Sequence, residues 1–116
     1  MAKKKFHHVG LRAMDPQPNE SYIPPSKCWV TNPADHPNTI EWLRYAEDSP
    51  IDPHFQESPH IAWEVEDLDD ALAGKDLHIA PCEVGEPPFA RVAFVIEDGL
   101  YVEYMQFKPG RRWFND

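Results

Sequence analysis

The sequence predicts an α+β fold built from two similar strand-rich units. Three features indicate this: two pairs of strand-like segments match in composition, a short amphipathic helix follows one of them, and prolines occupy the corresponding place in the other unit. Proline is excluded from helix interiors and central strands, so the first unit should lack that helix. A length of 116 residues suits one compact domain. We therefore expect a single domain over 1–116, with unit one at about 5–47 and unit two at about 58–108.

The repeat is clearest in two pairs of six-residue segments. Residues 8–13 read His-Val-Gly-Leu-Arg-Ala, and residues 60–65 read His-Ile-Ala-Trp-Glu-Val. Residues 40–45 read Ile-Glu-Trp-Leu-Arg-Tyr, and residues 102–107 read Val-Glu-Tyr-Met-Gln-Phe, so their residue classes agree at every position. Each pair carries an ionisable residue at the same place, a His in the first pair and a Glu in the second. Such repetition indicates that one structural unit occurs twice.

A short helix is predicted only in the second unit. The segment 67–75 has an acidic start, apolar residues at helical spacing and a Gly near its end, which is typical of a helix of about two turns. Its counterpart at 15–20 contains two prolines, so the first unit is expected to have lost this helix. The proline-rich region 14–39 should be mostly loop with short extended pieces.

Alternation of apolar and polar residues predicts the strands. They are expected at 5–13, 27–31, 38–46, 59–66, 77–84, 90–97 and 100–107. The dipeptide Asp98-Gly99 between the last two fits a two-residue hairpin turn.

The same alternation places one His and one Glu of each unit on a common side of the sheet. In the strand at 60–65, Ile61, Trp63 and Val65 form an apolar face suited to packing under the helix, so His60 faces the other way. The four residues placed in this way are His8, Glu41, His60 and Glu103. If the units pack as a pseudo-twofold pair, these side chains meet in one cleft. Imidazole and carboxylate ligands suit a divalent metal ion such as Zn, Ni, Co, Mn or Fe.

Each of these residues also has an ordinary interpretation. A lone His in a strand is more often a surface or core residue than a ligand, and a lone Glu is usually solvated at an edge. The metal site is favoured because the His and Glu recur at matched positions in both units.

Composition excludes several classes of partner. A net charge of −9 argues against binding to nucleic acid, which requires clustered Lys and Arg. The basic run from Lys3 to Lys5 is interpreted as a solvated end. No apolar stretch is long enough to span a membrane, and no apolar signal segment follows the N-terminus, so we expect a cytoplasmic protein. Cys28 and Cys82 match no zinc motif and are interpreted as plain core or surface residues.

The chain resembles the vicinal oxygen chelate superfamily, which includes glyoxalase I, methylmalonyl-CoA epimerase, fosfomycin-resistance proteins and extradiol dioxygenases. The motifs that carry the resemblance, which covers essentially the whole chain, are residues 8–13, 39–43, 59–65 and 100–105. It implies paired βαβββ modules whose curved sheet encloses a metal-centred cleft. Glyoxalase-type members are the most similar, because they supply His, Glu, His and Glu from the first, fourth, fifth and eighth strands.

The resemblance implies that His8, Glu41, His60 and Glu103 are the metal ligands. His7 is a rival for the first position, although the repeat favours His8. The remaining histidines match no ligand position: His36, His54 and His78.

The resemblance further implies an enzyme, an isomerase, epimerase or lyase that transfers a proton next to the carbonyl of a small 2-oxo or 2-hydroxy compound through a metal-bound enediolate. Glu103 is the expected base and Glu41 its partner. Arg12 matches a position where glyoxalase-type enzymes bind a substrate carboxylate, and Tyr45, on the same strand face as Glu41, is a second expected substrate contact. The shortened first module puts binding of glutathione in doubt.

Two other functions stay open. Extradiol dioxygenases of this superfamily hold Fe(II) with two His and one Glu, and Glu41 as a fourth ligand argues against that chemistry. Non-catalytic small-molecule binders usually lack the metal ligands. We also expect a homodimer, because the lost helix should expose an apolar sheet face that includes Val9 and Leu11, unless the proline-rich loop covers it.

Overall fold

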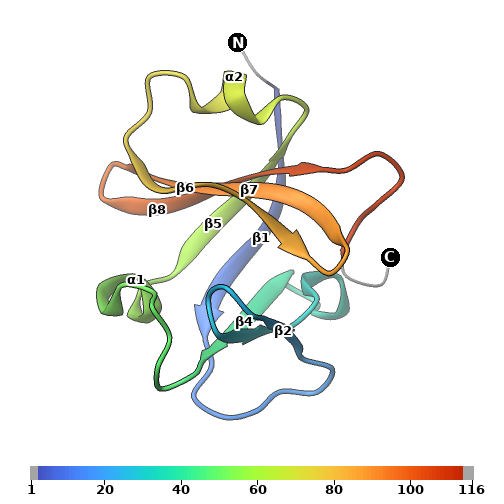
Figure 1. Ribbon diagram of the computed structural model, residues 1–116, viewed down its shortest axis with the longest axis vertical. Coiled ribbons are helices and arrows are strands. Elements are labelled where there is room, and N and C mark those ends of the chain that lie inside the picture. Colours follow the sequence, from blue (N-terminus) through green and yellow to red (C-terminus); the bar gives the residue numbers. More distant parts are fainter. Residues whose placement is uncertain (1–2, 114–116) are drawn as a thin grey trace.

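The computed structural model describes residues 3–113, which form one strongly curved sheet of eight strands with few helices (Figure 1). The strands are β1 (Lys4–Arg12), β2 (Ser21–Ile23), β3 (Cys28–Val30), β4 (Ile40–Tyr45), β5 (His60–Val65), β6 (Leu77–Gly85), β7 (Pro88–Glu97) and β8 (Leu100–Phe107). The helical elements are η1 (Pro33–Asp35), α1 (Pro53–Glu57) and α2 (Leu68–Leu72).

The strand order repeats itself about the centre of the sheet. The order is β2-β3-β4-β1-β5-β8-β7-β6, so β1 and β5 are the two central strands. From the centre outward, each half has the first, fourth, third and second strand of its unit. The strand β1 is parallel to β4, β5 is parallel to β8, and β1 and β5 pair antiparallel. Between β1 and β2 the described chain contains no helix, whereas α2 follows β5. The predicted α+β class, with a helix missing from the first unit, is confirmed.

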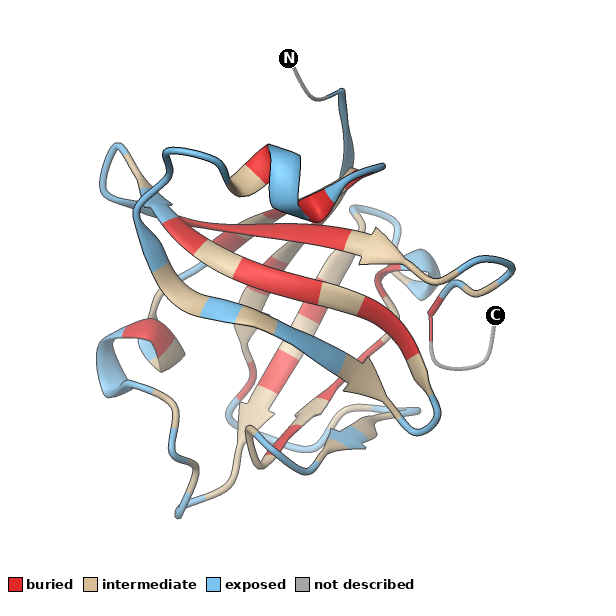
Figure 2. Cartoon of the chain, turned by 45° about the horizontal axis from the view of Figure 1, so that its top comes forward, coloured by how far each residue is buried: buried red, intermediate tan, exposed pale blue. Residues whose placement is uncertain are grey.

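Each face of the sheet carries its own hydrophobic core. The outer face packs against α2, and the core there comprises Val65, Leu68, Ala71, Val95, Val102 and Tyr104. The inner core comprises Cys28, Val30, Leu43, Ala62, Phe89, Ala90, Val92, Met105 and Trp113. Neighbours along β8 fall into the two cores, as strand geometry requires, and the buried positions are most numerous along β7 and β8 (Figure 2).

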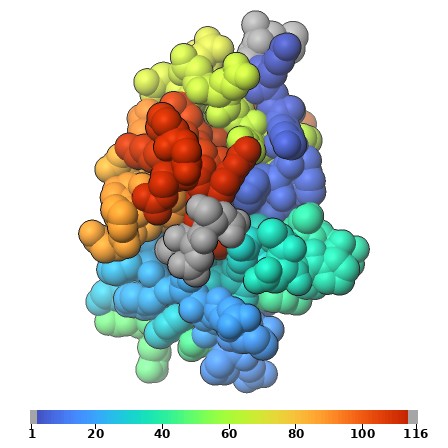
Figure 3. All heavy atoms as spheres, turned by 90° about the vertical axis from the view of Figure 1, so that its right-hand side faces the viewer, coloured from blue at the N-terminus to red at the C-terminus, as the bar shows by residue number. Residues whose placement is uncertain are grey.

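The curvature brings the two ends of the sheet together. Ile23 of β2 and Val84 of β6 pack against the same inner core although their strands lie at opposite edges. In the space-filling view, the light blue segment around β2 and β3 lies directly below the orange β6–β7 region (Figure 3). The sheet therefore encloses its inner face instead of opening it to solvent.

Some elements differ from those predicted. The helix α1 and the strand β2 were not predicted, because each is too short to show a periodic pattern. A capping signal for α1 is nevertheless present: the Asp52 side chain accepts a hydrogen bond from the His54 amide, and Pro53 occupies the first turn. At the predicted hairpin, Asp98 and Gly99 both have positive φ, 54° and 77°, as a type I′ turn requires.

No helix in the described part of the chain has the length and apolar character needed to cross a bilayer. The outer face of β1 carries the partly buried Val9 and Leu11. The homodimer expected to cover this face stays a prediction.

Candidate metal centre

A bulge in β1 turns His8 toward the inner face. Phe6 pairs with Trp63 and His8 with Ala62, so His7 is an extra residue in β1. In a regular strand Phe6 and His8 would share a face. With the extra residue, Phe6 packs its ring on Trp63 at a centroid distance of 5.9 Å, while the His8 ring is fully buried on the inner face. The bulge therefore lets β1 place Phe6 on the outer face and His8 in the candidate site on the inner face.

Gly10 makes room for His60. It pairs with Glu41 on one side and with His60 on the other, at the centre of the sheet. A Cβ atom at Gly10 would lie 2.0 Å from the His60 Cε1 atom, far inside van der Waals contact. The His60 ring therefore lies directly over the Gly10 backbone. This contact explains why the residue two positions after His8 must be small.

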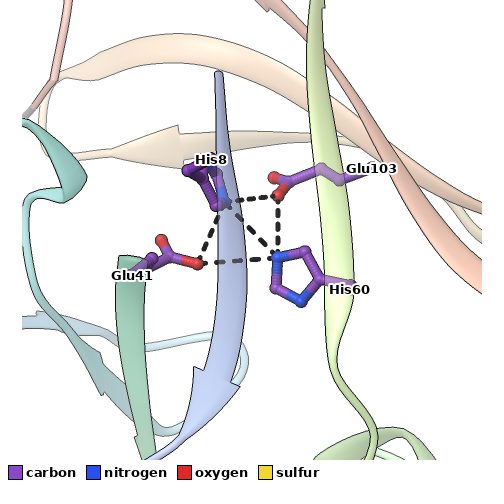
Figure 4. A group of neighbouring side chains, drawn as sticks. All are labelled: His8, Glu41, His60 and Glu103. Atoms are coloured by element: carbon purple, nitrogen blue, oxygen red, sulfur yellow. Dashed lines mark hydrogen bonds and ion pairs between the residues drawn. The ribbon is translucent and has the colours of Figure 1, made fainter. Parts of the chain in front are cut away.

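Four side chains from four neighbouring strands converge at this point (Figure 4). His8 Nε2 lies 3.2 Å from Glu41 Oε1 and 3.2 Å from Glu103 Oε1. His60 Nε2 lies 3.6 Å from Glu41 Oε1 and 3.2 Å from Glu103 Oε1. The two Nε2 atoms are 3.4 Å apart, and all four ligand atoms lie within 4.8 Å of one another.

These separations suit a common ion. Two donor atoms at about 2.1 Å from one cation are about 3.4 Å apart at a tetrahedral angle and about 3.0 Å apart at a right angle. Four of the five separations given above lie within this span, and the fifth, 3.6 Å between His60 Nε2 and Glu41 Oε1, lies slightly beyond it. Nitrogen and oxygen donors in this combination are those preferred by Zn, Ni, Co, Mn and Fe(II). The donor set therefore fits a divalent transition metal, and the residues that could hold it are the four predicted from the repeat.

The electrostatics of the cluster also favour a cation. Glu41 and Glu103 are 5% and 7% exposed, and in the described chain they form ion pairs only with His8 and His60. Burial lowers the pKa of His8, but the charges of Glu41 and Glu103 and the hydrogen bonds to them outweigh burial and raise it to about 10. Burial by itself would raise the pKa of Glu103. The hydrogen bonds and charges of His60 and His8 outweigh the effect of burial and lower this pKa to about 2. Without metal, a proton on His8 supplies the positive charge that these buried carboxylates require.

His7 contacts the far side of the His8 ring. The two Nδ1 atoms are 2.7 Å apart, and the His7 ring is held against Trp113 and Phe107 at centroid distances of 5.7 and 5.4 Å. Burial, followed by the charge of His8, lowers the pKa of His7 to about 4, so His7 is neutral near pH 7. Its Nδ1 lone pair can accept the Nδ1–H of His8, which leaves His8 Nε2 directed at the carboxylates.

A cavity of about 160 Å³ adjoins the cluster. Glu41 and Glu103 form part of its wall, and so does Tyr45, the predicted substrate contact. Burial raises the pKa of the Tyr45 phenol above its usual range, so the hydroxyl remains a hydrogen-bond donor. Phe55 of α1 also lines the cavity and stacks on the ligand ring of His60 at 5.9 Å and 16°.

Arg12, the other predicted substrate contact, is placed differently. Its Nη1 atom lies 3.6 Å from Glu57 Oε1 at the partly exposed end of β1. Arg12 is not among the residues that line the cavity. Its role in binding a substrate carboxylate stays a prediction.

The histidines that matched no ligand position lie outside the cluster. His54 Nδ1 is 2.7 Å from the hydroxyl of Tyr101, His78 Nε2 is 3.7 Å from Asp52, and His36 Nδ1 accepts a hydrogen bond from the Asn38 amide.

Three supporting residues were not predicted: His7 as a partner of His8, Gly10 as the floor beneath His60, and Phe55 as the stacking partner of His60. Only Gly10 had a usable signal, because a small residue follows the His by two positions in both units.

Comparison with known proteins informs the fold but not the activity. No family model matches the chain, and no curated protein matches it. Among solved structures, five chains match. One is a hypothetical protein, BH1468, from Bacillus halodurans C-125, with a TM-score of 0.68 and 19% identity over 94% of this chain and 98% of that one. The curved fold is therefore shared with a solved structure over nearly its full length.

Replacing Gly10 with Ala should displace the His60 ring. Because the ring would then be held in the wrong orientation for a metal ion, we expect the affinity for a divalent metal to fall by about tenfold or more. Calorimetric titration with Zn²⁺ or Co²⁺ measures this. The change should also lower the free energy of unfolding of the metal-free protein, but much less so in a His60→Ala background. Equal destabilisation in both backgrounds would contradict the proposed contact between Gly10 and His60.

Replacing His7 with Phe keeps an aromatic ring but removes the acceptor for His8 Nδ1–H, whereas His7→Asn keeps an acceptor oxygen near the same place. We expect metal affinity to fall by about tenfold in the Phe variant and to recover largely in the Asn variant. NMR of the His8 Nδ1–H proton provides a second readout, since this proton should be protected from exchange with solvent only where an acceptor is present. Equal affinity and equal protection of this proton in both variants would remove His7 from this role.

The stability of the metal-free protein should depend on pH through the cluster. The folded pKa of His8 is about 10 against an ordinary 6.5, so its contribution is complete below pH 6.5 and is lost as pH rises through 10. The folded pKa of Glu103 is about 2 against 4.5, so its contribution is complete above pH 4.5 and is lost as pH falls toward 2. His7 acts in the opposite sense to His8: its folded pKa is about 4 against an ordinary 6.5, so the free energy of unfolding falls as pH falls from 6.5 toward 4. Urea denaturation with chelator present should therefore show the highest free energy of unfolding near pH 6.5. The alkaline decline should flatten in His8→Gln, and a wild-type profile without that decline would refute the assignment.

Proposed function

We propose that this protein is a metal-dependent enzyme of the glyoxalase type, which transfers a proton next to the carbonyl group of a small 2-oxo or 2-hydroxy compound. The observation that carries the proposal is a buried set of two imidazoles and two carboxylates, within 4.8 Å of one another, at the wall of a cavity. The reaction class is that of an isomerase, epimerase or lyase.

His8, Glu41, His60 and Glu103 would hold the ion, and Zn, Ni, Co, Mn or Fe suits these donors. When bound, such an ion supplies Lewis-acid stabilisation of the negative charge that develops on a carbonyl oxygen as a proton leaves the adjacent carbon.

The chain supplies the proton transfer itself. Glu103 and Glu41 both reach the cavity, so each carboxylate can approach a carbon atom placed there. In the proposed isomerisation of a 2-hydroxy ketone, Glu103 accepts the proton from the carbon that bears the hydroxyl and returns it to the former carbonyl carbon, while the hydroxyl proton passes to the former carbonyl oxygen, so that no proton is gained or lost. Glu41, its mirror partner on β4, offers a second carboxylate to the same cavity. Tyr45 lines the same cavity, and in the proposed reaction its neutral hydroxyl donates a hydrogen bond to a substrate oxygen.

The alternative functions are less well supported. An extradiol-type dioxygenase would need only two His and one carboxylate on Fe(II), but Glu41 adjoins both His Nε2 atoms and supplies a fourth donor. A non-catalytic binder of the same superfamily would explain the cavity without explaining why two carboxylates are buried beside it.

The test is metal content together with exchange of the substrate proton. Elemental analysis of protein purified without chelator should find close to one transition metal per chain, and the His60→Ala variant should lose it. In D₂O, NMR should show that the wild-type protein exchanges the proton next to the ketone carbonyl in a panel of 2-hydroxy ketones and hydrated 2-oxo aldehydes. Glu103→Gln should slow that exchange by about a hundredfold or more. The control is Glu66→Gln, an exposed residue just after β5, which should leave the rate unchanged.

Iron content with oxygen uptake on catechols would support the dioxygenase instead. A stoichiometric metal with no exchange on any carbonyl compound in the panel would indicate the non-catalytic binder.

A further inference from the structure

The cavity beside the metal cluster has mainly apolar walls. Most of its lining is apolar and comes from both halves of the curved sheet, including Ile23, Leu43, Ile79, Val92 and Phe94. Its inner end is formed by the carboxylates of the cluster, and exposed residues such as Pro25 and Glu83 also line it. A ligand in this space therefore has one polar contact region at its buried end and apolar contacts along its length.

The charges around the cavity disfavour anionic ligands. The charged side chains that line it are Glu41, Glu83 and Glu103, and in the described chain no Lys or Arg does so. The nearby cation Lys108 pairs with Glu83, and Arg12 pairs with Glu57 away from the lining. A phosphate, a thioester of coenzyme A or a glutathione conjugate would bring its negative charges beside the Glu side chains of the lining, where no Lys or Arg of the described lining balances them.

The polar atoms that remain in the walls are uncharged. Burial raises the pKa of the Cys28 thiol to about 12, so this side chain stays protonated and packs as a small apolar group. Its sulfur lies 3.1 Å from the Ser26 hydroxyl, which satisfies that polar group within the wall. The Tyr45 hydroxyl is likewise neutral. These groups orient a ligand without attracting an ion.

The volume sets an upper size. About 160 Å³ is close to that of an engineered apolar cavity of about 150 Å³ in another protein that binds benzene. The space therefore admits one six-membered ring or a branched alkyl group of similar size, and a second ring would extend into solvent.

We propose that the cavity binds the apolar group of an uncharged substrate, a group about the size of a phenyl ring carried by a 2-hydroxy ketone or 2-oxo aldehyde whose oxygens face the four-residue cluster. The substrate class rests on the proposed function for its polar end, and on the cavity alone for its apolar end. The two parts are therefore testable separately.

The first test compares three ligands that differ in one feature. 2-Hydroxyacetophenone carries a phenyl group, hydroxyacetone carries a methyl group, and the para-carboxylate of 2-hydroxyacetophenone adds a negative charge to the ring. Binding is measured by titration calorimetry on the metal-free protein, so it does not depend on turnover. We expect the phenyl compound to bind at least about tenfold more tightly than the methyl compound, because burial of one ring removes apolar surface from water. The charged compound should bind about tenfold more weakly than its neutral parent. Equal or tighter binding of either competitor would overturn the proposal.

The second test fills the cavity. Ile79 of β6 lines it, whereas Leu77 of the same strand is 48% exposed and does not. Ile79→Trp should abolish the preference for the phenyl compound, and the matched control Leu77→Trp should retain it. A preference that survives in Ile79→Trp would place the ring elsewhere. The wild-type ligand comparison decides the proposal even if a variant fails to fold.

The two proposals fail in different ways. Selective binding of the neutral phenyl compound by a protein that holds no transition metal would overturn the proposed function and leave the cavity assignment intact. A bound metal with proton exchange, but without ligand selectivity, would overturn only the substrate class.

Discussion

The structure depends on the neutralisation of two carboxylates that the fold buries side by side with two imidazoles. Glu41 and Glu103 are almost entirely excluded from solvent, and burial of an uncompensated carboxylate costs several kcal/mol, on the order expected for any ion removed from water. Within residues 3–113 the side chains that pair with them are His8 and His60, so their charge is balanced by a proton on His8 or by a cation bound among the four side chains. A cluster of this kind is costly for a fold to keep unless it holds an ion or performs chemistry.

The sheet is arranged so that this cluster is possible. Parallel pairing of β1 with β4 and of β5 with β8 brings one His and one Glu together in each half, and antiparallel pairing of β1 with β5 joins the halves. Small residues, Gly10 and Ala62, occupy the centre, and a side chain at Gly10 would collide with the His60 ring. The helix α2 packs on the outer face of the second half. The cluster and the cavity are on the opposite, inner face.

Much of this arrangement was predictable from sequence, because it follows from local alternation. In strands, every second side chain shares a face, so the recurrence of His and Glu at matched positions was sufficient to bring His8, Glu41, His60 and Glu103 together. The supporting residues depend on contacts between distant segments. The bulge at His7 is set by pairing with β5, and Phe55 reaches His60 from a helix too short to leave a periodic signal. The position of Arg12 beside Glu57 depends in the same way on where α1 packs, which no local pattern encodes.

Anomalous X-ray diffraction, recorded at the absorption edge of the bound metal from crystals of protein purified without chelator, tests the central claim most directly. One peak is expected at about 2.0–2.2 Å from His8 Nε2, His60 Nε2 and a carboxylate oxygen of both Glu41 and Glu103. A peak confined to other residues, or no peak at this cluster in crystals that contain metal elsewhere, would contradict it.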